Sequence, residues 1–124
     1  MPTSRVVIYR EENGSVPFVD WFENLPDHAQ DKVLVRLERL RDLGHELRRP
    51  EADFLRDGIH ELRATSRGVH YRVLYFFHGR VAAVVAHGLA KEKAVPDRDI
   101  NLAIRRKRLF EGNPSKHTFE DANG

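Results

Sequence analysis

The sequence contains no cysteine, and none of its apolar runs approaches the roughly 18 residues of a membrane-spanning helix. Without cysteine, disulfides, thiolate metal sites and a cysteine nucleophile are excluded, and a reducing compartment suits the chain. The first ten residues also lack the long apolar core of a secretory signal. We therefore expect a cytoplasmic protein with no membrane partner.

Motifs of several common enzyme sites are missing as well. There is no glycine-rich loop of the kind that holds dinucleotides or nucleotides. Ser66 precedes an arginine and lacks the glycine pattern of a nucleophile elbow, which argues against a serine hydrolase. Five histidines do not form a metal-ligand spacing, namely His28, His45, His60, His78 and His117. We predict neither a metal nor any other cofactor.

The chain does have an uneven distribution of charge. Its 124 residues suit one domain, and its net charge is +2. Lys and Arg outnumber Asp and Glu by 12 to 5 in residues 56–110, but they are outnumbered 11 to 8 in residues 1–55 and 3 to 1 in residues 111–124. A basic surface favours a polyanion such as nucleic acid, because each neutralised phosphate releases counterions. A solvated basic face balanced by an acidic region accounts for the charge equally well.

Hydrophobic spacing predicts a strand and two helices in the first third of the chain. Arg5 to Arg10 is β-branched and aromatic, and the turn pair Asn13-Gly14 follows it. A helix capped by Ser15 should then end at Pro26, and a longer helix should run from Asp27 to Gly44. Apolar residues recur at helical spacing at Phe18, Trp21, Phe22 and Leu25, and again at Val33, Leu37 and Leu40. We expect these helices to form a hairpin.

The rest of the chain predicts a β-meander and a last helix. Leu47 to Arg56 contains Pro50 and shows little periodicity, so we interpret it as a connector. Pro96 opens the last helix and Gly112 ends it, which leaves one domain over residues 1–112 and a polar tail, expected to be mobile, over residues 113–124. The strands of the meander are Ile59 to Ala64, Val69 to Phe77 and Arg80 to Leu89. The expected fold class is α+β, in the order β-α-α-β-β-β-α.

The turns of the meander suggest a strand register. If Thr65 to Gly68 is a four-residue turn and His78-Gly79 a two-residue turn, then His70 lies opposite His87 and Glu61 lies opposite Arg72. Side chains alternate along each strand, so one face carries the core and the other is mixed. At its open end the mixed face gathers Glu61, Arg63, His70, Arg72 and His87.

Such a group suits phosphodiester chemistry. Arginines hold and neutralise a phosphate, while a group that titrates near neutrality moves protons. Lys91 and Lys93, just past the last strand, could join it. The alternative is a purely structural role, in which the two arginines pair with Glu61 and the two histidines are ordinary half-exposed strand residues. Arg105 to Arg108 could likewise bind RNA or simply stabilise the negative end of a helix.

Three segments together resemble the RelE/ParE toxin superfamily, and most closely its HigB-like, phage-derived branch. They are Asp57 to Arg63 (DGIHELR), His70 to Tyr75 (HYRVLY) and His87 to Lys91 (HGLAK), followed by the helix after Pro96. The resemblance extends over nearly the whole chain up to about Phe110. It implies the RelE-like fold and a bacterial type II toxin–antitoxin pair.

The resemblance also implies an activity and partners. Most of the superfamily are ribosome-dependent endoribonucleases that cut mRNA without a metal, by attack of a 2′-hydroxyl on the adjacent phosphate. The implied partners are a helix-turn-helix, HigA-like antitoxin, mRNA on the ribosome, and operator DNA reached through the antitoxin complex. Gyrase-inhibiting ParE-like relatives and an inactive relative that binds only antitoxin and DNA are the alternatives.

By motif position the resemblance assigns catalytic roles to four residues. Arg72 is the phosphate-binding arginine, Arg63 stabilises the transition-state charge, and Lys91 or His87 is the general base or acid. Residues expected to bind RNA are Lys93, His70, Arg67, Arg105 and Arg106. Many relatives have two adjacent lysines after the His-Gly pair, whereas here Glu92 separates Lys91 from Lys93.

Overall fold

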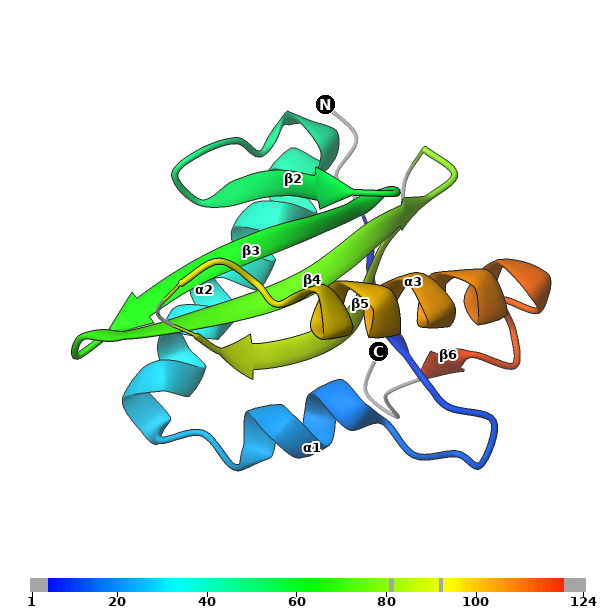
Figure 1. The fold of residues 1–124 in the computed structure, drawn as a ribbon, viewed down its shortest axis with the longest axis horizontal. Helices are drawn as coiled ribbons and strands as arrows, with labels where there is room; N and C mark the ends of the chain where they lie inside the picture. The colour runs from blue at the N-terminus through cyan, green and yellow to red at the C-terminus, as the bar shows by residue number, and fades with distance from the viewer. Residues whose placement is uncertain (1–4, 81, 92, 120–124) are drawn as a thin grey trace.

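The computed structural model describes residues 5–80, 82–91 and 93–119 (Figure 1). Within them a mixed sheet has the strand order β2-β3-β4-β5-β1-β6, in which β1 runs parallel to β5 and the other pairs are antiparallel. The strands are β1 (Arg5–Tyr9), β2 (Ala52–Arg56), β3 (Ile59–Ser66), β4 (Val69–His78), β5 (Ala82–Ala90) and β6 (Thr118–Phe119). The helices are α1 (Pro17–Glu23), α2 (Asp27–Leu43), the 3-10 turn η1 (Gly44–Glu46) and α3 (Asp97–Gly112).

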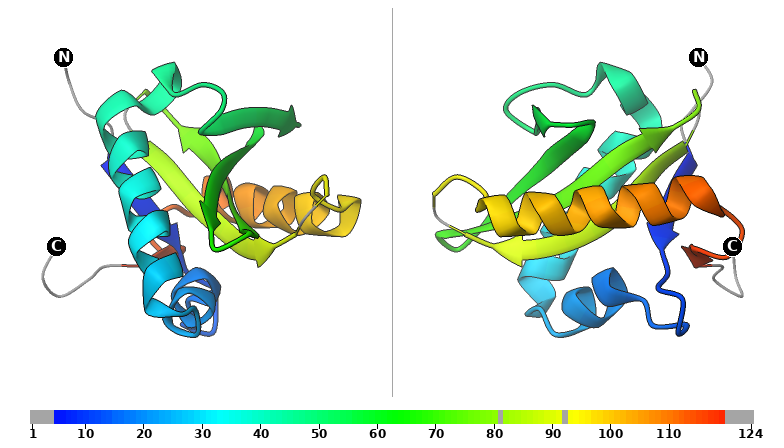
Figure 2. Two further views of the ribbon diagram at one scale, coloured as in Figure 1. Left: turned by 90° about the vertical axis from the view of Figure 1, so that its left-hand side faces the viewer. Right: turned by 45° about the vertical axis from the view of Figure 1, so that its right-hand side comes forward.

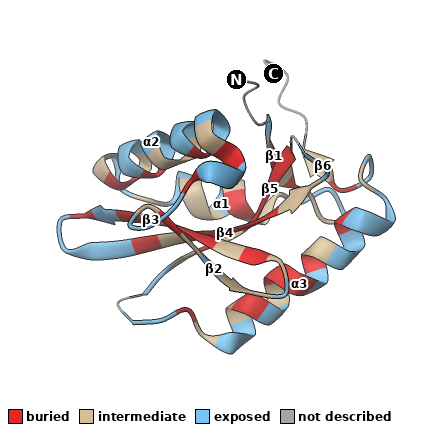
Figure 3. Ribbon diagram, turned by 90° about the horizontal axis from the view of Figure 1, so that it is seen from above, coloured by how far each residue is buried: buried red, intermediate tan, exposed pale blue. Residues whose placement is uncertain are grey.

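Helices cover both faces of this sheet. The α1–α2 hairpin lies on one face and α3 on the other, as Figures 2 and 3 show. Each face has its own cluster of buried apolar residues, so the middle of β4 and most of β5 are buried. No helix in the described ranges combines the length and the hydropathy that a bilayer crossing requires. The predicted α+β class is confirmed.

The helical hairpin forms where the apolar spacing predicted it. Pro17 lies in the first turn of α1, where its missing N–H costs nothing, and Phe18 is buried against the sheet. Val33 and Leu40 are fully buried on the inner face of α2. Gly44 ends α2 with a φ of 52°, a conformation that favours glycine.

The segment predicted to be a connector contains a strand. Residues 52–56 form β2, which pairs with β3 so that Ala52 faces Leu62 and Phe54 faces His60. The turn between them is Asp57-Gly58, with φ values of 53° and 82°. This is the backbone of a two-residue hairpin turn, for which Asp-Gly is a preferred pair. Together with β6, β2 adds two strands to the predicted order.

The predicted register of the meander is wrong, because the first turn is shorter than expected. Arg67 and Gly68 alone form it, with φ values of 50° and 80°, and Ser66 pairs with Val69. Arg72 therefore faces Arg63 rather than Glu61. A non-glycine residue rarely adopts a positive φ, so the sequence gives little sign of this turn.

The predicted pairing between β4 and β5 is wrong as well. His78 pairs with Ala82, so the second turn is longer than the predicted two residues, and the pairing shifts by one more residue at a β-bulge between Leu74 and Tyr75. His87 therefore faces Leu74 rather than His70. The extra residue, Ala86, turns the side chain of His87 from the α2 face to the α3 face. Val81, which the prediction placed in this strand, lies outside the described residues.

Part of the expected tail packs on the domain. Residues 118–119 pair with β1, and the buried ring of His117 stacks on Tyr9 with a centroid distance of 5.3 Å. The Nδ1 atom of His117 also bonds to the carbonyl oxygen of Arg10 at 2.8 Å. Mobility of the tail stays a prediction, and residues 120–124 lie outside the described residues.

Gly88 on β5 provides a test of the packing between α1 and the sheet. A Cβ atom at this position would overlap the indole ring of Trp21, so the ring would have to shift from its place against β5. We expect Gly88→Ala to lower the free energy of unfolding by about 1–3 kcal/mol, measured by urea denaturation. Gly112→Ala is the control, because nothing lies within 4 Å of its added Cβ. Equal stability of the two variants would contradict this packing.

Candidate functional site

A buried carboxylate organises the polar group on β3 and β4. Glu61 is only 3% exposed, and its Oε1 atom accepts hydrogen bonds from Arg63 Nε at 2.9 Å and from Arg72 Nη1. Arg63 Nη2 also reaches Asp53 Oδ2 on β2 at 3.4 Å. Two arginines that face each other across neighbouring strands would repel, and the carboxylate between them removes that repulsion.

Both arginines keep donors for a ligand. The side chain of Arg72 is 13% exposed and that of Arg63 is 37% exposed. Within the described residues, neither Arg63 Nη1 nor Arg72 Nη2 donates a hydrogen bond to the protein. Glu61 thus holds two guanidinium groups in place while N–H groups of each remain free, an arrangement suited to an anion such as phosphate.

Hydrogen bonds with Glu51 and Arg36 fix the backbone of Arg63. The Arg63 amide donates to the Glu51 carbonyl oxygen at 2.8 Å, and Arg36 Nε on α2 donates to the Arg63 carbonyl oxygen at 2.8 Å. The Glu51 carboxylate accepts two hydrogen bonds from Arg39, at 2.9 and 3.0 Å. These bonds hold the pKa of Glu51 below its usual value. They attach the start of β2 to α2 and so position Arg63.

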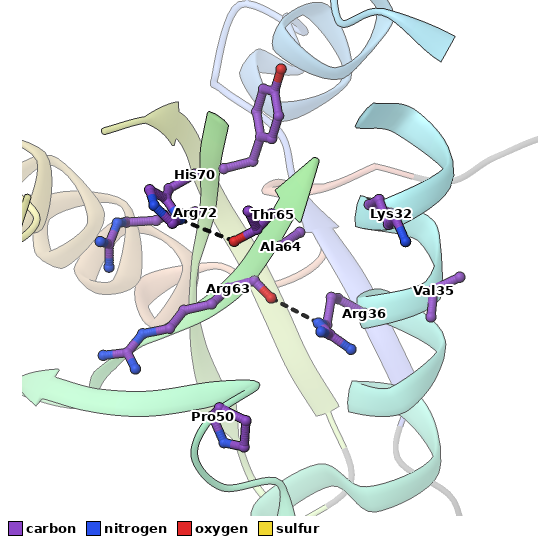
Figure 4. A pocket seen from close by; sticks show the side chains of 10 residues that line it. Lys32, Val35, Arg36, Pro50, Arg63, Ala64, Thr65, His70 and Arg72 are labelled. Atoms are coloured by element: carbon purple, nitrogen blue, oxygen red, sulfur yellow. Dashed lines mark hydrogen bonds between the residues drawn. The ribbon is translucent and has the colours of Figure 1, made fainter. Parts of the chain in front are cut away.

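A cleft of about 510 Å³ lies between α2 and the end of the β3–β4 hairpin (Figure 4). Among the described residues that line it, none is acidic. Figure 4 shows Lys32 and Arg36 on the α2 side, and Arg63 and Arg72 extending away from that helix. The lining residues are Lys32, Val35, Arg36, Pro50, Arg63, Ala64, Thr65, His70, Tyr71 and Arg72. The cleft therefore combines cations from both layers of the fold.

Two of the five predicted RNA-binding residues, His70 and Arg67, lie around this cleft. His70 is exposed, and its Nδ1 atom lies 3.0 Å from Thr65 Oγ1. Arg67 lies in the exposed hairpin turn and lines an adjoining hollow of about 600 Å³ that also includes Lys32. Lys93 and Arg105 are exposed but line neither of these hollows.

Lys91 is placed beside the arginines by its backbone. Its amide donates to the carbonyl oxygen of His70 at 2.9 Å, and its own carbonyl oxygen accepts from Arg72 Nε at 3.3 Å. Its side chain is exposed at the end of β5. Glu92, which separates this residue from Lys93 in the sequence, lies outside the described residues.

The structure holds His87 differently from the predicted proton-transfer role. Its Nε2 atom lies 2.7 Å from Asp99 Oδ1 on α3, and its Nδ1 atom lies 3.4 Å from Arg106 Nη1. Because a guanidinium only donates, Nδ1 is the acceptor and Nε2 donates to Asp99. Neither ring nitrogen is free to take a proton from a substrate in this arrangement, so a role in proton transfer requires α3 to release the ring.

Arg106 does not belong to the predicted RNA-binding surface. It is buried under α3, where Nη1 donates to the Ala86 carbonyl oxygen at 2.7 Å and Nη2 lies 3.7 Å from Glu11 Oε2. Burial lowers the pKa of this guanidinium from its ordinary value, and Glu11 opposes the shift. The basic run after Ile104 led to the prediction, but the helical turn directs Arg106 inward and leaves Arg105 outside.

Sequence reasoning missed the α2 side of the cleft. Lys32 and Arg36 are four residues apart and so lie on one face of the helix. The spacing alone predicts that the two cations share a helix face. It indicates a binding site only when the end of the β3–β4 hairpin is known to lie opposite that face. Glu51 and Asp53 were missed because they belong to the segment interpreted as a connector.

Comparison with known proteins identifies a family. The model of a family described as "Phage derived protein Gp49-like (DUF891)" matches residues 20–108, which is more than half of the chain and includes β2 to β5. No curated protein matches the chain significantly.

The Glu61 bridge predicts a stability cost for its removal. Glu61→Gln leaves two neighbouring guanidinium groups with a neutral acceptor, so we expect the free energy of unfolding to fall by about 1–3 kcal/mol in urea denaturation. Glu111→Gln is the matched control, because Glu111 pairs with Lys107 on the surface and should contribute less than about 1 kcal/mol. A bridge that does nothing for the fold would leave the two variants alike.

The lowered pKa of Glu51 predicts a pH dependence. A carboxyl whose pKa is lower in the folded than in the unfolded chain stabilises the fold above its unfolded pKa, and this contribution is lost as the pH falls through the folded pKa. Glu51→Gln should therefore lose stability less steeply than the wild type between about pH 5 and about pH 2. The control is Glu38→Gln, an exposed position on α2. Parallel stability curves for the wild type and Glu51→Gln would rule this out.

Proposed function

Because the chain belongs to the Gp49-like phage-derived family, within the RelE/ParE-like toxin superfamily, we propose that it is a ribosome-dependent mRNA endoribonuclease of the HigB-like kind. The family is toxin-like and implies an antitoxin partner. The proposal places the chain in a bacterial type II toxin–antitoxin pair, with a helix-turn-helix, HigA-like antitoxin through which it reaches operator DNA. The family match agrees with the resemblance to phage-derived proteins, whereas the assignment to the HigB-like branch is part of the proposal.

The observation that carries the proposal is the pair of arginines held by Glu61 beside a cleft with a cationic lining. Phosphoryl transfer needs donors fixed where charge develops on the phosphate oxygens. Arg72, mostly buried and bonded to both Glu61 and the Lys91 carbonyl oxygen, is the more rigidly held and is assigned to the scissile phosphate. Arg63, more exposed, is assigned to the transition-state charge.

The proposed reaction is a transesterification within the RNA strand. The 2′-oxygen of a ribose bonds to the adjacent phosphorus, the bond from phosphorus to the 5′-oxygen of the next nucleotide breaks, and a cyclic phosphate forms. A base takes the 2′-hydroxyl proton and an acid supplies a proton to the departing 5′-oxygen. Lys91 is the better placed of the two candidates, because its side chain is exposed whereas both nitrogens of His87 are engaged.

The engagement of His87 also favours a second candidate function. If α3 never releases the ring, the site has fewer groups for proton transfer, which suits a ParE-like inhibitor of gyrase or an inactive relative that binds only its antitoxin and DNA. In these alternatives the cationic cleft binds a polyanion without cleaving it.

Substitution of Arg72 separates these candidates. Expression of the wild type in bacteria should arrest growth and degrade mRNA, and Arg72→Ala should reduce cleavage about a hundredfold or more, because it removes a donor to the phosphate. Arg72→Lys keeps the charge but loses the fork geometry and should also be impaired. Northern blots of abundant messages measure the loss.

The control is Arg108→Ala, an exposed position on α3, which should remain as toxic as the wild type. Thermal unfolding of the purified Arg72 variants separates loss of activity from loss of fold. Growth arrest with intact mRNA and induced DNA repair would favour the gyrase inhibitor, and normal growth with the wild type would favour the inactive relative.

A further inference from the structure

A group of aromatic rings lies on the α2 side of the sheet, beyond the end of α2. His60 stacks on Tyr75 at a centroid distance of 5.2 Å and meets Phe54 edge-on at 5.2 Å. His45 stacks on Phe77 at 3.6 Å, and Phe77 meets His60 edge-on. We call these five residues the aromatic ledge. Four of its members come from β2, β3 and β4, whose pairing brings the rings together.

The outer end of the aromatic ledge is open to solvent. Phe54 is 55% exposed on the edge strand β2. Beside it lies a hollow of about 460 Å³, lined by Phe54 and His60, by the exposed residues Arg48 and Arg49, and by Asp53, which pairs with Arg49. A large exposed ring beside two guanidinium groups gives a surface that is apolar and cationic at once.

This combination fits the unpaired bases of a single-stranded nucleic acid. Bases stack on aromatic side chains, and neighbouring cations follow the backbone phosphates. Burial lowers the pKa of His60 and raises that of Tyr75 to about 12, so neither ring adds a charge to the aromatic ledge near pH 7. A purely apolar protein partner would leave Arg48 and Arg49 without a role in binding, and an acidic peptide would leave the exposed ring of Phe54 without one.

The aromatic ledge is also connected to the arginine pair. Arg49 Nη2 lies 2.7 Å from Asp53 Oδ2, and the same oxygen lies 3.4 Å from Arg63 Nη2. Asp53 therefore links the hollow on one side of β2 to the Glu61 cluster on the other. A strand held at Arg63 and Arg72 can continue around the β2 edge to the aromatic ledge.

We propose that the aromatic ledge binds one or two unpaired bases of the RNA that flank the cleaved bond, with Phe54 as the stacking ring and Arg48 as a phosphate contact. The identity of the ligand as RNA rests on the proposed function. The stacking itself depends only on the ring, the hollow and the two arginines.

Binding of an uncleavable probe tests this inference. The probe is a short single-stranded 2′-O-methyl oligoribonucleotide, and an abasic strand of equal length supplies the same phosphates without bases. Phe54→Ala should weaken binding of the base-bearing strand about fivefold to a hundredfold and leave the abasic strand unaffected. Arg48→Gln should weaken both strands and lower the salt slope of binding by about 0.7. Fluorescence anisotropy at several salt concentrations measures both effects.

Three further variants make the result specific. Phe54→Tyr should bind like the wild type, and Leu109→Ala, an exposed apolar residue on α3, should have no effect. Phe54→Leu should bind like Phe54→Ala; full binding by the leucine variant would indicate an apolar protein contact and overturn the inference. Equal binding of both strands by the wild type would overturn it too. No cleavage is measured, so loss of stacking and loss of nuclease activity are separate results.

Discussion

The carboxylate of Glu61 is the constraint on which the rest of the site depends. Strand pairing brings Arg63 and Arg72 directly opposite each other, which is unfavourable unless a negative charge lies between them. Glu61 supplies that charge from a buried position, and Asp53 on β2 forms a second ion pair with Arg63. Three strands therefore meet at one ionic network, and within the described residues Arg63 Nη1 and Arg72 Nη2 are left to donate to a ligand. The buried ion pair is best understood as a device for position, since such pairs contribute little net stability.

The fold brings a basic hairpin end and a basic helix face together around this network. The tight turn at Arg67-Gly68 fixes the register that pairs the arginines, and the bulge at Ala86 turns His87 toward α3. Arg36 on α2 then bonds to the backbone of Arg63, so the helical hairpin supports the site as well as the core. The outcome is a cleft with cations on both walls and a separate aromatic ledge on the far side of β2.

The helices and strands could be predicted from the sequence better than the strand register and the packing between them. Periodicity located both helices of the hairpin, the last helix and the meander, because burial of one face leaves a clear spacing of apolar residues. Periodicity missed β2, because the charged residues and the neighbouring proline of this segment hide its alternation. It also missed the strand register, which depends on a positive φ at Arg67 and on a bulge that has no sequence signature. Arg63 and Arg72 were found by motif, whereas the burial of Arg106 and the hold of Asp99 on His87 arise only from the packing of α3.

The chemistry of cut mRNA ends tests the central claim most directly. Purified chain is added to ribosomes stalled on a defined message, and both new ends are identified. We expect cleavage in the presence of a chelator, with a 2′,3′-cyclic phosphate on the upstream fragment and a 5′-hydroxyl on the downstream fragment. Intact message, or ends with a 3′-hydroxyl and a 5′-phosphate, would contradict it.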